Sequence, residues 1–307
     1  MKVTSDSLFH FTTSLAKLKG ILSEKFQLTY CHEKYELDYE THDSYYPMVS
    51  FCDIPLSLAK DQIKKYGSFA IGMNKEWGIK NNLNPVVYIE KDSLLAKDIQ
   101  SSIDNMSKAA SAMSIIAQKN TLQVKKTVIA ALQEVQTLIK NFNHDTKQQA
   151  LSALNDAVKE ISTNSQTFKQ LTDPFIEASQ NSYNLFRYIK NYRGPLKRGN
   201  ITFKNYRFYD EREWRYIPTI KDERLKKSLK LDEYREYRGT KKEKKFIPNI
   251  NLSFSGTDIK YLIVRSERDV PKLIKSLRSI NNLTNNSVET DILSTKILTV
   301  EQLNSDF

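Results

Sequence analysis

The chain has 307 residues, of which 39% are hydrophobic, and its formal net charge at pH 7 is +11. This length accommodates one large domain or two small ones with a buried core. A mean hydropathy of −0.54, no long apolar run and no secretory signal predict a cytoplasmic protein without a membrane span. Two isolated cysteines, Cys31 and Cys52, and four scattered histidines predict neither a disulfide framework nor a metal site.

Residues 8–22 predict a short strand followed by a helix. Thr13 or Ser14 can cap this helix, and leucines and isoleucines at helical spacing form its apolar stripe. His10 lies in the strand, where a histidine is more often a hydrogen-bonded structural residue than a functional one; both roles stay open. Three further apolar segments predict strands, at 47–57, 66–73 and 84–89.

Two carboxylates lie two residues apart in the segment 210–216, whose sequence is DEREWRY. Its aromatic residues favour a strand, which would place Glu211 and Glu213 on one face and Arg212 and Trp214 on the other. Like charges side by side on a strand repel each other unless a ligand uses that face. The plainer alternative is a solvated edge strand rich in charges.

Four stretches carry a family resemblance: HFT at 10–12, PMVSFCDIPLS at 47–57, YGSFAIGMNKEWG at 66–78 and NPVVYI at 84–89. With them, the first 90 residues resemble the first component of the abortive-infection AbiG family, which carries an antitoxin label; EREWR matches more loosely. The order of the motifs is also distantly similar to the mono-ADP-ribosyltransferase fold, including the DNA-modifying toxins of the DarT type. That resemblance implies NAD as substrate, a histidine on the first strand and a glutamate on a late strand.

Cleavage of the nicotinamide–ribose bond of NAD passes through an oxocarbenium-like transition state, which a nearby carboxylate stabilises. On the transferase interpretation, Glu213 supplies this carboxylate, and Glu211 orients or deprotonates the acceptor. A Rossmann mode of NAD binding is not expected, because no glycine-rich loop joins a strand to a helix. The residues expected to bind NAD lie near the two N-terminal strands: His10, Phe11, Thr12, Tyr46, Ser50 and Phe51.

Positive charge gathers in the C-terminal half, where Lys and Arg are interleaved with Tyr between residues 183 and 245. This mixture suits phosphates and stacked bases and predicts contact with nucleic acid. The alternative is a lysine-rich surface that only keeps the protein soluble. The segment 221–246 has few apolar residues and is expected to be a loop or a solvated helix.

Residues 95–194 are nearly free of Gly and Pro, and their apolar residues recur at helical spacing. They predict an all-helical insertion with a turn at 141–145, which serves as a core-forming scaffold or as a docking arm for a partner protein. The strands on either side are too few to form separate sheets, so 1–94 and 195–307 are expected to make one discontinuous domain. Within its second part we expect a strand at 259–264, a helix at 270–280 and a last strand at 292–300.

The fold class expected is therefore α+β, an ADP-ribosyltransferase-like split sheet with a large all-helical insertion. The function expected is NAD-dependent transfer of ADP-ribose to a macromolecule, with nucleic acid as the acceptor, in phage defence or a toxin–antitoxin system. Two alternatives stay open. One is a non-catalytic antitoxin that binds a toxic partner protein, and the other is a nucleic-acid-binding regulator.

Overall fold

The structure, a computed structural model, describes residues 5–139, 184–198, 201–219, 225–240, 245–280 and 283–306, with scattered helical positions between 148 and 181. The chain divides into two compact units: residues 1–96 with 187–307, and residues 97–186. The second unit ends before the predicted bound at 194, because Ile189–Asn191 forms a strand that pairs with Val87–Ile89.

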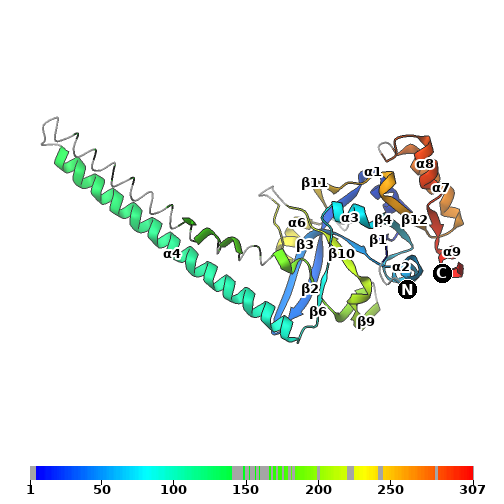
Figure 1. The fold of residues 1–307 in the computed structure, drawn as a ribbon, viewed down its shortest axis with the longest axis horizontal. Helices are drawn as coiled ribbons and strands as arrows, with labels where there is room; N and C mark the ends of the chain where they lie inside the picture. The colour runs from blue at the N-terminus through cyan, green and yellow to red at the C-terminus, as the bar shows by residue number, and fades with distance from the viewer. Residues whose placement is uncertain are drawn as a thin grey trace. The chain divides into compact units, whose positions relative to one another are not determined.

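The first half of the chain begins with the predicted strand and helix, and an unpredicted strand, β2, follows them (Figure 1). Ser14 caps the first helix by accepting a hydrogen bond from the Lys17 amide at 3.3 Å, and Leu18 and Leu22 form its buried stripe. The elements are β1 (Ser7–Thr12), α1 (Leu15–Glu24), β2 (Phe26–Leu37), β3 (Glu40–Cys52), α2 (Ala59–Tyr66), β4 (Phe69–Asn74), α3 (Lys75–Lys80), β5 (Asn84–Pro85), β6 (Val87–Ile89) and α4 (Leu94–Ile139).

After the insertion the chain returns to short strands and helices. They are β7 (Ile189–Asn191), β8 (Arg193–Arg198), β9 (Ile201–Arg207), β10 (Glu213–Tyr216), α6 (Leu231–Arg238), β11 (Phe246–Leu252), β12 (Ile259–Val264), α7 (Val270–Ser279), α8 (Ser287–Ser294), β13 (Ile297–Thr299) and α9 (Val300–Asp306).

Three predictions about these segments have different outcomes. The helix α6 lies inside the segment 221–246 and has no buried residues, which agrees with the solvated helix expected there as one alternative. The last strand is shorter than predicted, because the Asn286 side chain caps a helix that runs to Ser294. The turn predicted at 141–145 lies outside the described residues.

Among the described residues, nine strands form one mixed sheet. Its main order is β11-β2-β3-β1-β4-β12-β13, and β10 pairs with β3 and β5. Strands from after the insertion pair with strands from before it: β11 pairs with β2, β10 with β3, and β12 with β4. The two flanking segments therefore contribute strands to one sheet.

Both faces of this sheet are covered by hydrophobic clusters. On β1, Leu8 belongs to the larger cluster, which also contains Phe26, Phe51 and Trp77. Its neighbour Phe9 belongs to the smaller cluster, with Phe11 and Cys52 packed against it. Successive side chains of a strand point to opposite faces, so these memberships identify the face that each neighbouring residue occupies.

The helices of the described segments include none that is both long enough and apolar enough to cross a membrane. The longest, α4, has 46 residues, and its sequence mixes apolar side chains with lysines, glutamines and serines.

Candidate functional site

The acidic segment does not form the continuous strand that its sequence predicts. Residues Phe208–Glu211 form a 3-10 turn, Arg212 has a left-handed backbone with a φ of 43°, and β10 begins only at Glu213. The prediction that Glu211 and Glu213 share a strand face, opposite Arg212 and Trp214, is therefore wrong. The left-handed residue ends the ladder, and the amide of Asp53 donates to its carbonyl at 3.0 Å.

Both acids are nonetheless buried, with 3% of Glu211 and 5% of Glu213 exposed. The alternative of a solvated edge strand is thus wrong for both. A buried carboxylate is stable only when it is paired and hydrogen-bonded, so their partners decide what they can do.

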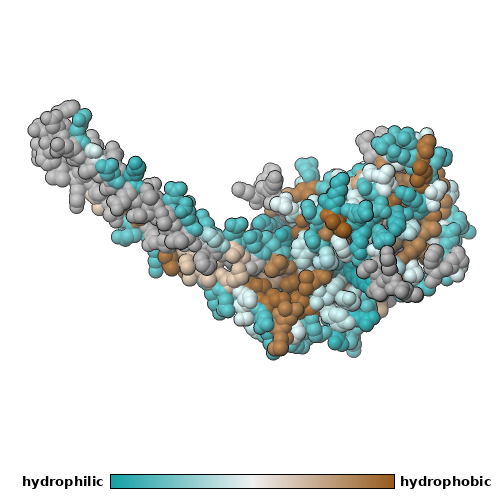
Figure 2. Space-filling view, viewed as in Figure 1, coloured by the Kyte–Doolittle hydropathy of each residue, from teal (hydrophilic) through white to brown (hydrophobic). Residues whose placement is uncertain are grey.

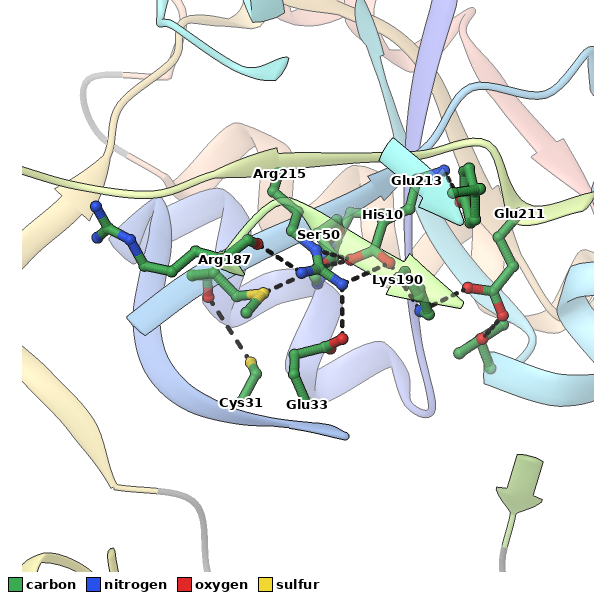
Figure 3. Close-up of polar contacts among 12 residues, drawn as sticks. His10, Cys31, Glu33, Ser50, Arg187, Lys190, Glu211, Glu213 and Arg215 are labelled. Atoms are coloured by element: carbon green, nitrogen blue, oxygen red, sulfur yellow. Dashed lines mark hydrogen bonds and ion pairs between the residues drawn. The ribbon is translucent and has the colours of Figure 1, made fainter. Parts of the chain in front are cut away.

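The carboxylate of Glu213 is held by three side chains (Figure 3). Its Oε1 accepts from the Ser50 hydroxyl at 2.6 Å and from Arg215 Nε at 2.8 Å, and its Oε2 accepts from Lys190 Nζ at 2.8 Å and from an Arg215 terminal nitrogen at 3.2 Å. The Glu213 amide also donates to the Tyr88 hydroxyl at 2.7 Å. Both carboxylate oxygens are therefore engaged by cations or by a hydroxyl.

Lys190, from β7, joins the two acids of the segment. Its Nζ lies 3.2 Å from Glu211 Oε2 as well as 2.8 Å from Glu213 Oε2. The other oxygen of Glu211 accepts from the hydroxyl of Tyr66, at the end of α2. The two carboxylates thus meet across one ammonium group and do not depend on a shared strand face.

Arg215 is the most deeply buried member of the group, with none of its surface exposed. Besides Glu213, it donates to Glu33 Oε2 at 2.7 Å and to the carbonyl of Arg187 at 2.6 Å. We call these five residues the ionic network: Glu33, Lys190, Glu211, Glu213 and Arg215. It joins β2, β7 and β10 to the turn before β10.

The pKa values of the network show that its charges hold each other in place. Burial alone would raise the pKa of Glu213, but Arg215 and Lys190 outweigh burial and hold this pKa far below its usual range. Burial alone would lower the pKa of Lys190, but Glu213 and Glu211 raise it well above its usual value. The pKa of Arg215 is raised in the same way, against burial, by Glu213 and Glu33. Glu213, Lys190 and Arg215 are therefore all charged at neutral pH.

His10 does not face the acids. Phe9 and Glu213 both pair with Cys52, so Phe9, Cys52 and Glu213 point to one face of the sheet, and His10 points to the other. The ring of His10 packs against Phe26 and Phe51 in the larger hydrophobic cluster. Its Nδ1 lies 2.9 Å from the carbonyl oxygen of Ser50. A carbonyl oxygen only accepts, so this hydrogen bond requires that Nδ1 carries the proton.

The other residues predicted to bind NAD lie in different surroundings. Phe51 is 1% exposed and packs against Phe26 and Trp77. Tyr46 is buried, and burial raises its pKa. Thr12 is buried on the His10 face, and Phe11 packs on the opposite face. Ser50 hydrogen-bonds to Glu213, whereas His10 and Thr12 lie on the other face of the sheet, and the assignment of this set to NAD stays a prediction.

Sequence reasoning found Glu211, Glu213 and Ser50 but missed the two cations that hold them. One signal for Arg215 was present: in Glu213-Trp214-Arg215 the charged residues alternate with an aromatic one, which is typical of an ion pair on one strand face. Lys190 carried no such signal, because it comes into contact with the acids only through the pairing of β7 with β6. Within the described residues, no three His, Cys, Asp or Glu side chains are grouped to hold a metal ion.

Fold and site together define a mixed α+β protein with a large helical segment and a buried ionic network beside its main sheet. The sequence model of the family described as "Putative abortive phage resistance protein AbiGi, antitoxin" matches residues 24–265. This match covers most of the chain, which therefore belongs to the AbiGi family.

A curated relative supports the same assignment. The abortive phage resistance protein AbiGi of Lactococcus lactis subsp. cremoris is 25% identical over 278 residues, which cover 86% of this chain and 89% of that protein. No solved structure matches the chain. The AbiG resemblance is thus confirmed, while the likeness to ADP-ribosyltransferases remains a prediction.

Proposed function

We propose that this chain is the neutralising component of an abortive phage resistance system and acts by binding a toxic partner protein. The antitoxin description of its family supports this assignment. The chemistry of the ionic network supports it too, because Ser50, Lys190 and Arg215 already occupy both carboxylate oxygens of Glu213.

The observation that carries the proposal is an apolar patch where α4 begins (Figure 2). Four exposed side chains belong to the chain segments around this start, with exposed fractions of 71% for Tyr39, 52% for Val87, 78% for Leu94 and 55% for Leu95. The Asp38 amide donates to the Lys91 carbonyl at 2.9 Å, which holds the β2–β3 turn beside the segment leading into α4. Exposed apolar side chains that gather in this way mark interaction surfaces, and their burial stabilises protein complexes.

A pair of charge substitutions tests the proposal. Leu94→Lys with Leu95→Lys should raise the Kd for the toxic partner of the same system by about 100-fold, the scale at which central apolar anchors contribute to binding. Titration calorimetry of the two purified proteins measures this Kd, and growth of cells that co-express them measures neutralisation. Val288→Lys on α8 is the control, because Val288 is 65% exposed in a different part of the chain. Unchanged affinity in the double variant would overturn the proposal.

The NAD-dependent ADP-ribosyltransferase is a second candidate, and one observation favours it. Ser50 and Glu213, two of its predicted residues, meet at 2.6 Å from segments that are 163 positions apart in the sequence. Incubation of the purified chain with labelled NAD and nucleic acid tests it. Label transfer that is lost in a folded Glu213→Gln variant would support the enzyme, and the absence of both NAD binding and transfer would refute it.

A further inference from the structure

The segment 187–209 differs from the rest of the chain in charge. It contains seven Lys or Arg residues and six aromatic residues, and no Asp or Glu. Arg187 and Lys190 lie at the edge of the ionic network, where Arg187 supplies a carbonyl and Lys190 an ammonium group. The other five basic residues all belong to the hairpin formed by β8 and β9 (Figure 1).

The pairing of β8 with β9 puts like charges opposite each other. Arg193 is the direct cross-strand partner of Arg207, and Lys197 is the partner of Thr202. Leu196 and Tyr206 are buried, whereas Arg193, Lys197 and Arg207 are exposed on the other face. Two cations directly opposite on a ladder destabilise the hairpin, and an anion bound between them would remove this cost.

Each arginine of this pair has one carboxylate at its side. Arg193 Nε lies 3.0 Å from Glu90, and Arg207 Nε lies 2.7 Å from Asp210. All four side chains are at least 44% exposed, and exposed pairs of this kind contribute little stability. A guanidinium binds a phosphate with two parallel hydrogen bonds, so phosphates can replace both carboxylates at small cost.

Aromatic rings lie beside these cations. The Arg193 guanidinium lies 5.8 Å from the ring centroid of Tyr192. Tyr209 is 47% exposed and packs against Tyr192 at 5.6 Å. Bases of a single strand stack on such rings, whereas bases of a duplex are already stacked on each other. The rings therefore favour an unpaired strand over a duplex, a lipid surface or an acidic protein.

We propose that the β8–β9 hairpin binds single-stranded nucleic acid. Arg193, Lys197, Lys204 and Arg207 contact the phosphates, and Tyr209 stacks on a base. This contact is independent of the apolar patch at the start of α4, so the proposal stands or falls separately from the neutralisation of a toxin. The shared chemistry is a phosphodiester strand with accessible bases, and RNA and DNA are told apart by experiment.

Fluorescence anisotropy of the full chain tests the proposal, with labelled 12-nucleotide single-stranded RNA and DNA, the corresponding duplex, and vesicles of anionic phospholipid. Lys197→Glu with Lys204→Glu should weaken binding to the preferred single strand by at least about tenfold. The slope of log K against log salt concentration should become shallower by about 1.4, since each lost phosphate contact in a single strand contributes about 0.7.

Two control variants sharpen the result. Lys80→Glu with Lys275→Glu makes the same change in net charge at exposed lysines of α3 and α7, and binding should change by less than about twofold. Tyr209→Ala should weaken binding to the single strand more than binding to the duplex. Equal losses in the two charge variants, stronger binding to the duplex or to the vesicles, or no binding at all would each overturn the proposal.

Discussion

The ionic network and the β8–β9 hairpin are neighbours in the sequence but treat charge in opposite ways. In the network, each cation lies within 3.2 Å of a carboxylate, and Arg215 has no exposed surface. In the hairpin, an arginine faces an arginine across the ladder, and their carboxylate partners lie in solvent. A count of charged residues does not separate these regions. The surroundings of each charge do, because buried ion pairs hold a fold together and exposed, weakly paired charges are available to a ligand.

The largest effect should come from a substitution in the ionic network. Arg215→Met keeps an unbranched side chain but leaves Glu33 and Glu213 without their shared cation. The free energy of unfolding should fall by about 3–5 kcal/mol, the cost of removing one partner from a buried ion pair. Urea titration followed by circular dichroism measures it.

Arg207→Met is the matched control in the β8–β9 hairpin. Its side chain is 59% exposed, and its ion-pair partner Asp210 is 44% exposed, so the free energy of unfolding should change by less than about 0.5 kcal/mol. Similar losses in the two variants would show that the two regions do not differ as described.

The second prediction concerns pH and the network. Because the folded pKa of Glu213 lies far below its usual range, its stabilising contribution is complete above the ordinary carboxyl value of about 4.3 and is lost as pH falls through the folded pKa. Lys190 has a raised pKa, so its contribution is complete below about 10.4 and is lost as pH rises through the folded pKa.

The free energy of unfolding should therefore form a plateau between about pH 5 and pH 10. Glu213→Gln removes the acidic titration, so the variant should lose less stability than the wild type when the pH is lowered from about 5 to about 2. Urea titrations at a series of pH values provide the comparison. Parallel curves for the two proteins would contradict the pairing of Glu213 with Arg215 and Lys190.

Sequence reasoning succeeded where periodicity decides the structure and was wrong where a single backbone conformation does. The strand and helix at 259–280 and the pairing across the insertion follow from apolar spacing and from the number of strands a sheet needs. The turn at Glu211 was missed because the left-handed conformation of Arg212 has no marker in its sequence.

The candidate site was predictable in its acids and not in its cations. Glu211, Glu213 and Ser50 stand in recognisable segments, and the structure brings them together. His10 was expected beside them, but a strand alternates its faces, and the register of β1 on β3 points the ring of His10 away from the carboxylates. The register of two strands depends on contacts between distant parts of the chain, and a single sequence does not reveal it.

A smaller effect within the network should come from Ser50→Ala. The variant removes the hydroxyl that donates to Glu213 at 2.6 Å but leaves both cations in place. The free energy of unfolding should fall by about 1.5–3 kcal/mol, the contribution of a hydrogen bond to a charged group. Ser279→Ala, at an exposed serine at the end of α7, should change it by less than about 0.5 kcal/mol. A near-neutral Ser50→Ala would show that the ammonium and guanidinium groups alone hold the carboxylate.

The smallest expected effect concerns the two carboxylates that pair with the arginines of the β8–β9 hairpin. Asp210→Asn with Glu90→Gln releases Arg207 and Arg193 from their exposed partners. Affinity for the single-stranded oligonucleotide should increase by about two- to fivefold, because an exposed ion pair is worth about 0.5–1 kcal/mol. The free energy of unfolding should change by less than about 0.5 kcal/mol. Anisotropy and urea titration measure the two quantities.

Glu301→Gln, at an exposed position of α9, controls for the change in net charge. If that control raises the affinity as much per charge removed, the gain reflects the charge of the whole protein, and the cross-strand arginine pair is not the site of contact.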